Sequence, residues 1–592
     1  MQAETRTCQN CKQNFTIDPE DFQFYEKIKV PPPTFCPECR MQRRFVARAA
    51  MALYWRECAL CGNRMLSMYS SDKPYTVYCL SCWNSDKWDA TSYGQDYDFS
   101  KNFFEQFSRL LKRVPRPSLL VEHGTVENSE YCNQVDHVKN CYLVFNAAYN
   151  EQCYYCHSIN RSKEAFDSMH LDGCELVYGC FQSQQSYRSS YLINSRNCMD
   201  SYFLKDCVNC KDCLGCFGLK DKQYYIFNQP YSKEEYVTEL KNMRLDTYEG
   251  MSEARKKFDE YISHFPIRSL YQRLTANVSG NYIYESKNCI NCFIVNGVER
   301  GKYVQFMETP PIKDVMDYTV WGDKAELVYE CSGCGFGISN LKFSRVTVQT
   351  LNATYADLVT ASSNIFASVG LQKKSYCILN KQYSKEEYEK LLPKIIQQMQ
   401  DMPYVDAKGR EYRYGEFWPP FLVDLAYNES IAQEYFPLTK KAANDLGYSW
   451  KDAEVRSYAI SKKPEDLPSS IDEVNDSILK ETIGCMHGGT CEEQCSTAFR
   501  IIPQELQFYK RMRLPLPRLC PNCRYYERVR LREQLDLIER KCNCAGISSE
   551  DGAYKNTASH FHNEEVCPNK FETSSAEKQI VYCESCYQSE VV

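Results

Sequence analysis

Pairs of cysteines separated by two or three residues occur near both ends of this chain. The N-terminal pairs are Cys8/Cys11, Cys36/Cys39, Cys58/Cys61 and Cys79/Cys82. The C-terminal region holds Cys491/Cys495, Cys520/Cys523, Cys542, Cys567 and Cys583/Cys586. A turn of this kind brings two thiolates to one tetrahedral metal ion, and two turns form a closed site of four sulfurs. A closed site leaves no position for water, so we expect structural rather than catalytic zinc.

Taken in order, these cysteines predict about four zinc ions per chain. The predicted ligand sets are Cys8, Cys11, Cys36 and Cys39; Cys58, Cys61, Cys79 and Cys82; Cys491, Cys495, Cys520 and Cys523; and Cys542, Cys567, Cys583 and Cys586.

The two ends of the chain are copies of one module. The second and third ligands of the first site are 25 positions apart in both copies, and its fourth ligand precedes the next site by 19 positions in both. The text between the ligands agrees, because residues 15–25 match residues 499–509 and residues 30–40 match residues 514–524. Four sites at matched spacing in two copies are a specific pattern.

The C-terminal copy carries an insertion, residues 543–566, between two predicted ligands. The insertion contains Cys544, His560 and His562, and His487 lies just upstream of the module. One interpretation is a fifth metal site. The other is that these histidines are packed or solvated side chains, which is the more common role of scattered histidines.

A basic stretch links the two N-terminal sites. Residues 40–56 contain Arg40, Arg43, Arg44, Arg48 and Arg56 and no acidic residue, and we predict them to be helical. Steps of three and four residues would align the arginines on one face, where they could contact nucleic-acid phosphates. The alternative is a solvated helix face that only links two zinc sites. The C-terminal equivalent includes four acidic residues, so the two copies do not share a uniformly basic surface.

The composition sets the expected environment. The chain has 592 residues, 34 of them cysteine, and a formal net charge of −6. It has no apolar segment of membrane-spanning length and no export signal, so we expect a cytoplasmic protein that does not contact a membrane. In a reducing compartment, paired cysteines indicate metal ligands rather than disulfides.

The middle of the chain is repetitive. Small residues that follow a polar or turn-forming residue recur, mostly in steps of twelve, between residues 128 and 228. We interpret the pattern as a β-solenoid of twelve-residue strand-and-turn units, two units per coil. A second, weaker copy covers about residues 280–380. Each copy precedes a predicted helix, with Ser232 or Ser384 as N-cap and Glu235 or Glu387 completing a capping box.

A run of four cysteines inside the first repeat permits two interpretations. Cys207, Cys210, Cys213 and Cys216 resemble an iron–sulfur motif, but the last spacing differs from the bacterial ferredoxin pattern and no proline follows. Because Cys210 fits the twelve-residue repeat, we favour thiols buried inside the solenoid over a metal or cluster site.

The predicted fold is mixed and β-rich, with duplicated two-zinc modules at both ends flanking two β-solenoid segments with capping helices. The predicted boundaries are 1–90 for the first module, 91–120 for a helical linker, 121–230 for the first solenoid, 231–270 for capping helices, 271–380 for the second solenoid, 381–402 for a capping helix, 403–484 for an aromatic and acidic linker, and 485–592 for the second module.

Several motifs are similar to those of uncharacterised zinc-ribbon and treble-clef proteins of candidate-phyla bacteria. They are residues 32–44, 69–75, 383–388 and 517–523. The resemblance covers most of the chain and implies zinc-ribbon or treble-clef modules, zinc binding and a prokaryotic cytoplasm. It supplies no catalytic residues.

Three functions are compatible with these patterns. The first is a non-catalytic scaffold or adaptor that binds a macromolecular partner, most simply a protein. The second is a nucleic-acid- or ribosome-associated zinc protein that uses the arginines of residues 40–56. The third is an enzyme, either a metal-dependent nuclease or an iron–sulfur redox protein. The chain lacks a glycine-rich phosphate loop and a nucleophile elbow, so we place the enzyme last.

Overall fold

The middle of the chain winds into two stacks of short parallel strands, here named coil segments 1 and 2. The computed structural model describes residues 2–308, 310–320, 322, 325–326, 328–452, 458–491, 493–576 and 578–591. The chain divides into two units. Unit 1 contains residues 1–119, 270–451 and 534–538, and unit 2 contains residues 120–269, 452–533 and 539–592. Each unit therefore joins one coil segment to most of the cysteine-rich module from one end of the chain.

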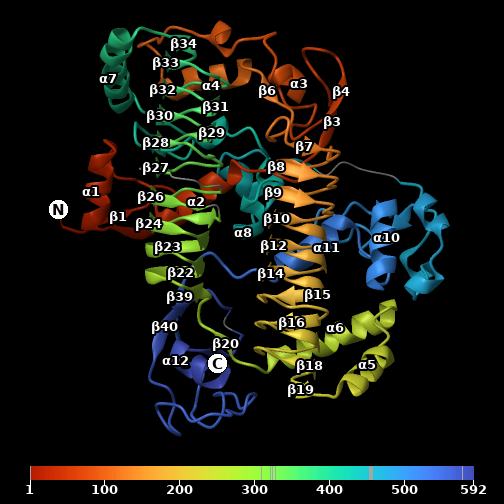
Figure 1. The fold of residues 1–592 in the computed structure, drawn as a ribbon. Coiled ribbons are helices and arrows are strands. Elements are labelled where there is room, and N and C mark those ends of the chain that lie inside the picture. The colour runs from red at the N-terminus through yellow and green to blue at the C-terminus, as the bar shows by residue number, and fades with distance from the viewer. Residues whose placement is uncertain are drawn as a thin grey trace. The chain divides into compact units, whose positions relative to one another are not determined.

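Coil segment 1, in unit 2, is the orange-to-yellow column of strands in Figure 1. Its parallel partners lie twelve residues apart, as in the pairing of His157 with Met169 and of Lys163 with Glu175. Strands β9 to β15 form a closed ring of seven, because β13 also pairs with β15. The strands are β7 (Val126–Glu127), β8 (Asn133–Lys139), β9 (Phe145–Glu151), β10 (His157–Asn160), β11 (Lys163–Phe166), β12 (Met169–Asp172), β13 (Glu175–Tyr178), β14 (Phe181–Gln184), β15 (Tyr187–Ile193), β16 (Tyr202–Lys205), β17 (Lys211–Leu214), β18 (Gln223–Ile226) and β19 (Gln229–Pro230).

The twelve-residue register corrects the expected coil length. We predicted two twelve-residue units per coil, but a partner twelve residues away means that each coil contains only one. The shorter coil is accompanied by a period of three residues in both burial and backbone conformation. Every third residue from Cys132 to Cys216 is buried, and each residue just before these positions, from Gln134 to Gly215, has a positive φ. Asn, Asp and Gly tolerate this left-handed conformation best, which explains turn-formers such as Asn209.

The small inward side chains also link successive coils. The hydroxyl of Ser186 accepts a hydrogen bond at 3.2 Å from the backbone N–H of Cys198, one coil further along. Ser195 and Cys207 repeat the contact at 3.1 Å. Serine and cysteine therefore occupy inward positions because they are small and can satisfy backbone groups of the neighbouring coil.

Coil segment 2, in unit 1, repeats this architecture less regularly (green in Figure 1). Its strands form one sheet of twelve and one pair, β29 with β31. They are β21 (Gln272–Arg273), β22 (Ala276–Tyr284), β23 (Lys287–Asn296), β24 (Val298–Lys302), β25 (Gln305–Met307), β26 (Ile312–Met316), β27 (Val328–Tyr329), β28 (Ser339–Lys342), β29 (Arg345–Val348), β30 (Leu351–Thr354), β31 (Asp357–Thr360), β32 (Ser363–Phe366), β33 (Ser375–Ile378) and β34 (Lys381–Gln382).

A helix follows each coil segment, as predicted. Helix α5 (Lys233–Asn242) contacts β18, and α7 (Lys385–Asp401) contacts β33. Ser232 and Ser384 are their N-caps, and both capping boxes are formed.

The remaining elements of unit 1 are short. They are β1 (Glu4–Thr7), β2 (Asn14–Ile17), α1 (Pro19–Lys27), α2 (Pro37–Val46), β3 (Tyr54–Glu57), β4 (Arg64–Ser67), β5 (Val77–Tyr78), α3 (Leu80–Trp83), η1 (Ala90–Tyr93), α4 (Phe103–Arg113), β6 (Arg116–Pro117), β35 (Tyr404–Val405), β36 (Glu411–Tyr412), η2 (Pro420–Leu422), η3 (Tyr427–Glu429), α8 (Ala432–Tyr435) and α9 (Lys440–Asp445).

Two local expectations for unit 1 need correction. The helix predicted over residues 40–56 ends at Val46, because Arg56 belongs to β3, which pairs with β4 in the hairpin that presents Cys58 and Cys61. The segment expected to be a linker after residue 403 is partly built into the core. Trp418 is 1% exposed, and its indole N–H donates to the carbonyl of Phe343 at 2.6 Å.

The remaining elements of unit 2 follow coil segment 1 in the sequence. They are α6 (Tyr248–Ser263), β20 (Ile267–Arg268), η4 (Pro464–Asp466), η5 (Ile471–Glu473), η6 (Asp476–Lys480), β37 (Ile483–Gly484), β38 (Ala498–Phe499), α10 (Pro503–Met512), α11 (Pro521–Val529), β39 (Ile538–Lys541), β40 (Lys570–Thr573), β41 (Val581–Tyr582) and α12 (Glu584–Val591).

Candidate metal centres

Among the residues that the structure describes, groups of four cysteines gather near both ends of the chain, two at each end. Within each group, all sulfur atoms lie within 4.8 Å of one another. Three groups coincide with sets predicted from spacing. These are Cys8, Cys11, Cys36 and Cys39; Cys58, Cys61, Cys79 and Cys82; and Cys542, Cys567, Cys583 and Cys586. The donor chemistry and geometry are those of zinc-binding modules.

Each group has the same backbone support. The N–H of the third cysteine donates to the sulfur of the first, at 3.1–3.3 Å. The third cysteine also lies at the start of a helix: Cys36, Cys79 and Cys520 are the N-caps of α2, α3 and α11, and Cys583 directly precedes α12. N–H donors and the positive end of a helix both favour a thiolate, the form that binds metal.

In three groups, contact with a neighbouring thiol lowers the pKa of one cysteine; in the first N-terminal group, contact with Cys36 lowers the pKa of Cys8. Contact with the Cys485 thiol lowers the pKa of Cys520 to about 4. Contact with Cys542 lowers the pKa of Cys583 to about 4. The same contacts raise the pKa of Cys485 and Cys542. A metal ion would stabilise the ionised form of both thiols of each pair.

The remaining group, the first of the two near the C-terminus, differs from the set predicted by spacing. It contains Cys485, Cys495, Cys520 and Cys523. Cys491, predicted as a ligand, lies beside the group with its sulfur 3.7 Å from that of Cys523. Five cysteines therefore surround a site that needs four.

Strand pairing identifies Cys485 as the counterpart of Cys8. Cys8 follows β1, in which Arg6 pairs with Phe15. Cys485 follows β37, in which Ile483 pairs with Phe499, the residue that matches Phe15 in sequence. The spacing pattern does not reveal Cys485, because nine residues separate it from Cys495 whereas two residues separate Cys8 from Cys11.

We predict different consequences for the two neighbouring cysteines. Cys485→Ser should reduce the zinc content of the purified chain by about one ion, because it removes a ligand that accepts the Cys520 N–H. Cys491→Ser should retain that ion. Metal analysis after dialysis against a competing chelator distinguishes them, and loss from Cys491→Ser alone would reverse the assignment.

The arginines expected to face phosphates are instead buried. Arg40, Arg43, Arg44 and Arg48 are each at most 7% exposed. Arg56 is partly exposed and donates to the carbonyl of Tyr75 at 3.0 Å. The expectation of a solvent-facing basic helix is therefore wrong for α2. Burial lowers the pKa of Arg48 to about 10, since a charged guanidinium loses its water there.

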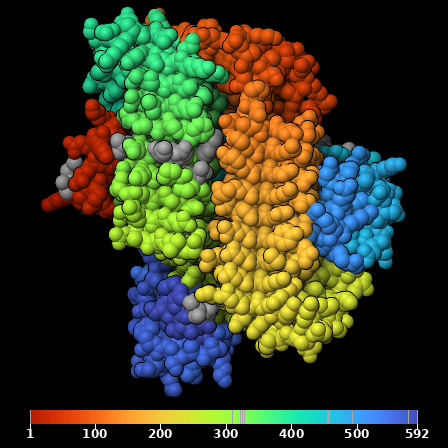
Figure 2. Space-filling model, in the orientation of Figure 1, coloured from red at the N-terminus to blue at the C-terminus, as the bar shows by residue number. Residues whose placement is uncertain are grey.

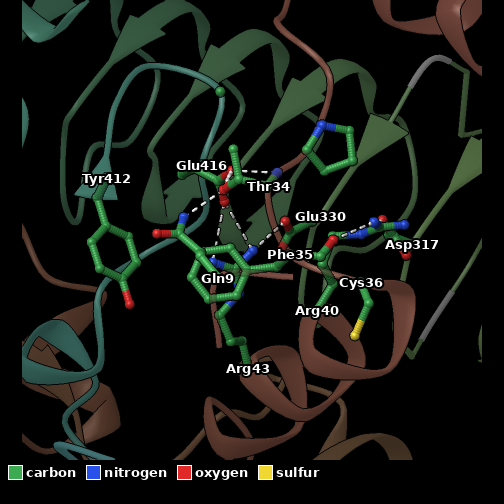
Figure 3. Close-up of polar contacts among 12 residues, drawn as sticks. Gln9, Thr34, Phe35, Cys36, Arg40, Arg43, Asp317, Glu330, Tyr412 and Glu416 are labelled. Carbon is green, nitrogen blue, oxygen red and sulfur yellow. Dashed lines mark hydrogen bonds and ion pairs between the residues drawn. The ribbon is translucent and has the colours of Figure 1, made fainter. Parts of the chain in front are cut away.

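Carboxylates of coil segment 2 and of the segment after α7 pair with these arginines (Figure 3). Arg40 Nε lies 2.6 Å from Asp317 Oδ2, and an Arg44 terminal nitrogen lies 3.4 Å from Asp317 Oδ1. Arg43 contacts Glu330 at 2.6 Å and Glu416 at 3.3 Å. Because Cys36 of the first cysteine group is the N-cap of α2, these pairs connect that group directly to the coils of unit 1.

Unit 2 contains an equivalent network. Arg524 and Arg528 of α11 contact Asp167 of coil segment 1 at 3.1 and 3.3 Å, and Arg524 also contacts Glu505 at 3.2 Å. Asp167 and Asp317 both occupy left-handed corners of their coils, with φ of 47° and 64°. The duplicated arginines therefore fasten each cysteine module to a coil segment.

The cysteine run in coil segment 1 follows from the period of three. Cys207, Cys210, Cys213 and Cys216 occupy consecutive inward positions and are at most 1% exposed. Each sulfur lies 3.3–3.5 Å from the carbonyl oxygen two residues earlier. This geometry gives all four thiols a packing role and a hydrogen-bond acceptor.

Comparisons with known proteins assign no family. Neither a protein-family model nor a curated protein matches the sequence. One similar solved structure is the crystal structure of a proposed acetyltransferase from Desulfovibrio desulfuricans G20, with 8% identity over 52% of this chain and 95% of the other. Its TM-score of 0.09 is too low to inform fold or function. Among the residues that the structure describes, every helix is too short or too polar to span a bilayer.

Proposed function

We propose that this protein is a non-catalytic, zinc-binding scaffold whose coil segments, as β-solenoids, present a rigid surface to a partner protein. The observation that carries the proposal is the buried arginine–carboxylate network. The arginines of α2 form buried ion pairs inside unit 1, so they are not available to bind the phosphates of a nucleic acid. The four-cysteine groups supply four sulfurs each, which suits structural zinc of the zinc-ribbon or treble-clef type.

Coil segment 1 carries an exposed column of side chains suited to binding. One column runs across nine successive coils, with strand register placing each residue beside the next: Glu127, Lys139, Glu151, Lys163, Glu175, Tyr187, Met199, Lys211 and Gln223. Charges alternate along the first five positions. Figure 2 shows the stacked coils of coil segment 1 as a continuous orange-to-yellow surface in this view.

Two less polar residues interrupt the row of charged side chains. Tyr187 and Met199 are adjacent on neighbouring coils and are 40% and 39% exposed. An exposed aromatic beside a methionine, flanked by charged residues, has the composition of a protein-binding hot spot with a polar rim. We therefore place the partner contact at Tyr187 and Met199.

Site-specific photocrosslinking tests this surface. A photoreactive phenylalanine analogue at position 187 should crosslink a discrete protein in lysate of the native cells. The Met199→Ala substitution should weaken that capture about tenfold, as loss of a hot-spot side chain does. The matched control is the same analogue at Tyr149, an aromatic that is 58% exposed elsewhere on coil segment 1 and stacks on His137.

The outcomes separate the candidate functions. Capture at position 187 but not at 149 supports the scaffold. Equal capture at both positions, or none at position 187, contradicts the proposed surface. Loss of the crosslinked species after nuclease treatment would replace the protein partner with a nucleic acid.

A further inference from the structure

One cysteine of the C-terminal module belongs to two groups of potential ligands. Cys586 completes the group of Cys542, Cys567 and Cys583. It also completes a group with Cys544, His560 and His562, in which one ligand atom from each residue lies within 4.8 Å of the others. A sulfur in both groups is placed to bridge two metal ions.

Both histidines in the second group are oriented as metal ligands. His562 Nδ1 lies 2.7 Å from the carbonyl oxygen of Glu565, to which it can only donate, and this leaves Nε2 with a free lone pair. That Nε2 lies 3.3 Å from the sulfur of Cys586. A backbone carbonyl that fixes the tautomer in this way is a typical partner of a metal-binding histidine.

His560 is oriented by a carboxylate. Its Nε2 lies 2.8 Å from Glu590 Oε1, with both side chains fully buried, and its Nδ1 faces the sulfur of Cys544 at 3.6 Å. Donation from Nε2–H to the carboxylate leaves the Nδ1 lone pair directed at the group. Carboxylate–histidine–metal arrangements are common around zinc.

The surroundings hold this arrangement in place. Glu590 accepts the backbone N–H groups of Thr557 at 2.9 Å and Ala558 at 3.1 Å, so its charge is satisfied at a fixed position. The side-chain amide of Asn556 donates to the sulfur of Cys544 at 3.2 Å, and that of Asn569 donates to the sulfur of Cys583 at 3.3 Å. Amide donors to sulfur therefore serve both groups, as expected for two sets of thiolates.

We propose that two zinc ions of the C-terminal module share the Cys586 thiolate, one held by the four-cysteine group of Cys542, Cys567, Cys583 and Cys586 and the second by Cys544, His560, His562 and Cys586. The second site belongs to the insertion of residues 543–566. The N-terminal module contains no histidine, so it cannot form the equivalent. The inference rests on zinc binding by the four-cysteine groups and adds a fifth ion to them.

Metal counting on the full-length protein tests the second ion. The wild-type chain should contain about five zinc ions, four in four-sulfur groups and one at the new site. His560→Ala combined with His562→Ala should lower the content by one and leave the other four in place. A third variant, His264→Ala, changes a histidine outside the module and should keep all five.

Cadmium NMR of the metal-exchanged protein tests the shared sulfur. Two resonances from the C-terminal module should be coupled to each other through Cys586, and replacing the two histidines should abolish one of them and shift the other. Four zinc ions in both the wild type and the double variant would overturn the second site while leaving the four-sulfur groups intact. Five ions without coupling would overturn the bridge, and a metal-free wild-type chain would instead remove the zinc scaffold itself.

Discussion

Removal of zinc should unfold the terminal modules while the coil segments stay folded. The modules contain little regular structure to stand without metal; in the second N-terminal group, for example, β5 has two residues and α3 has four. Structural zinc contributes about 10–16 kcal/mol in small zinc domains, which exceeds what such short elements supply. The coils are joined by backbone hydrogen bonds between neighbours twelve residues apart, and these bonds involve no metal.

Hydrogen exchange with mass spectrometry measures both parts at once. After treatment with a thiol-reactive mercurial and a chelator, peptides covering residues 54–83 should lose protection, whereas peptides covering residues 157–214 should retain most of theirs. Restoring reduced thiols and zinc should restore the protection. If peptides of the modules remain protected after all metal has been removed, zinc is not a structural element of this fold.

The spacing of cysteines predicted most of the candidate site because a metal-binding turn is local. The two thiols of Cys8 and Cys11 are presented by a single hairpin, so the chain between them carries the information. Cys485 could not be predicted in this way, because an insertion separates it from Cys495 by ten positions and the two cysteines no longer form a local pattern. Only the pairing of β37 with β38 identifies its role.

The burial of the arginines depends on residues far away in the chain. Asp317 lies 277 positions from Arg40, and no local pattern links them. Comparison of the copies did contain a clue. Arg40 and Arg44 correspond to Arg524 and Arg528, whereas Arg43 corresponds to Glu527. The shared positions are those that contact an aspartate in both units, and the position that differs pairs with Glu330 in unit 1 alone.

The coil length was misjudged because two periods coexist. Steps of twelve between similar small residues were visible, but the period of three in burial was obscured by the variety of inward residues, which include Cys, Ser, Val, Leu and Asn. Because inward positions recur every three residues, the four-residue strands of these coils do not show the alternation of buried and exposed residues that is typical of a half-buried strand. The repeat and the presence of strands can therefore be predicted from the sequence, whereas the number of residues in one coil cannot.

Substitution of the buried carboxylate of Asp317 should strongly destabilise unit 1. Asp317 is fully buried and contacts both Arg40 and Arg44, so Asp317→Asn leaves two buried guanidinium groups without their shared counter-charge. Breaking a buried pair in this way costs about 3–5 kcal/mol. All six tryptophans lie in the sequence ranges of unit 1, so tryptophan fluorescence during urea unfolding reports the stability of this unit.

Two matched variants isolate the effect of burial. Asp314 also has a left-handed backbone, with φ of 49° against 64° for Asp317, and it also pairs with an arginine, Arg300, at 2.6 Å. Its arginine is exposed, so Asp314→Asn should cost about 0.2–1 kcal/mol. Asp167→Asn breaks the equivalent buried pair in unit 2 and should leave the tryptophan transition of unit 1 unchanged while destabilising peptides of α11 in hydrogen exchange. Similar costs for Asp314→Asn and Asp317→Asn would show that the network does not fasten α2 to the coils.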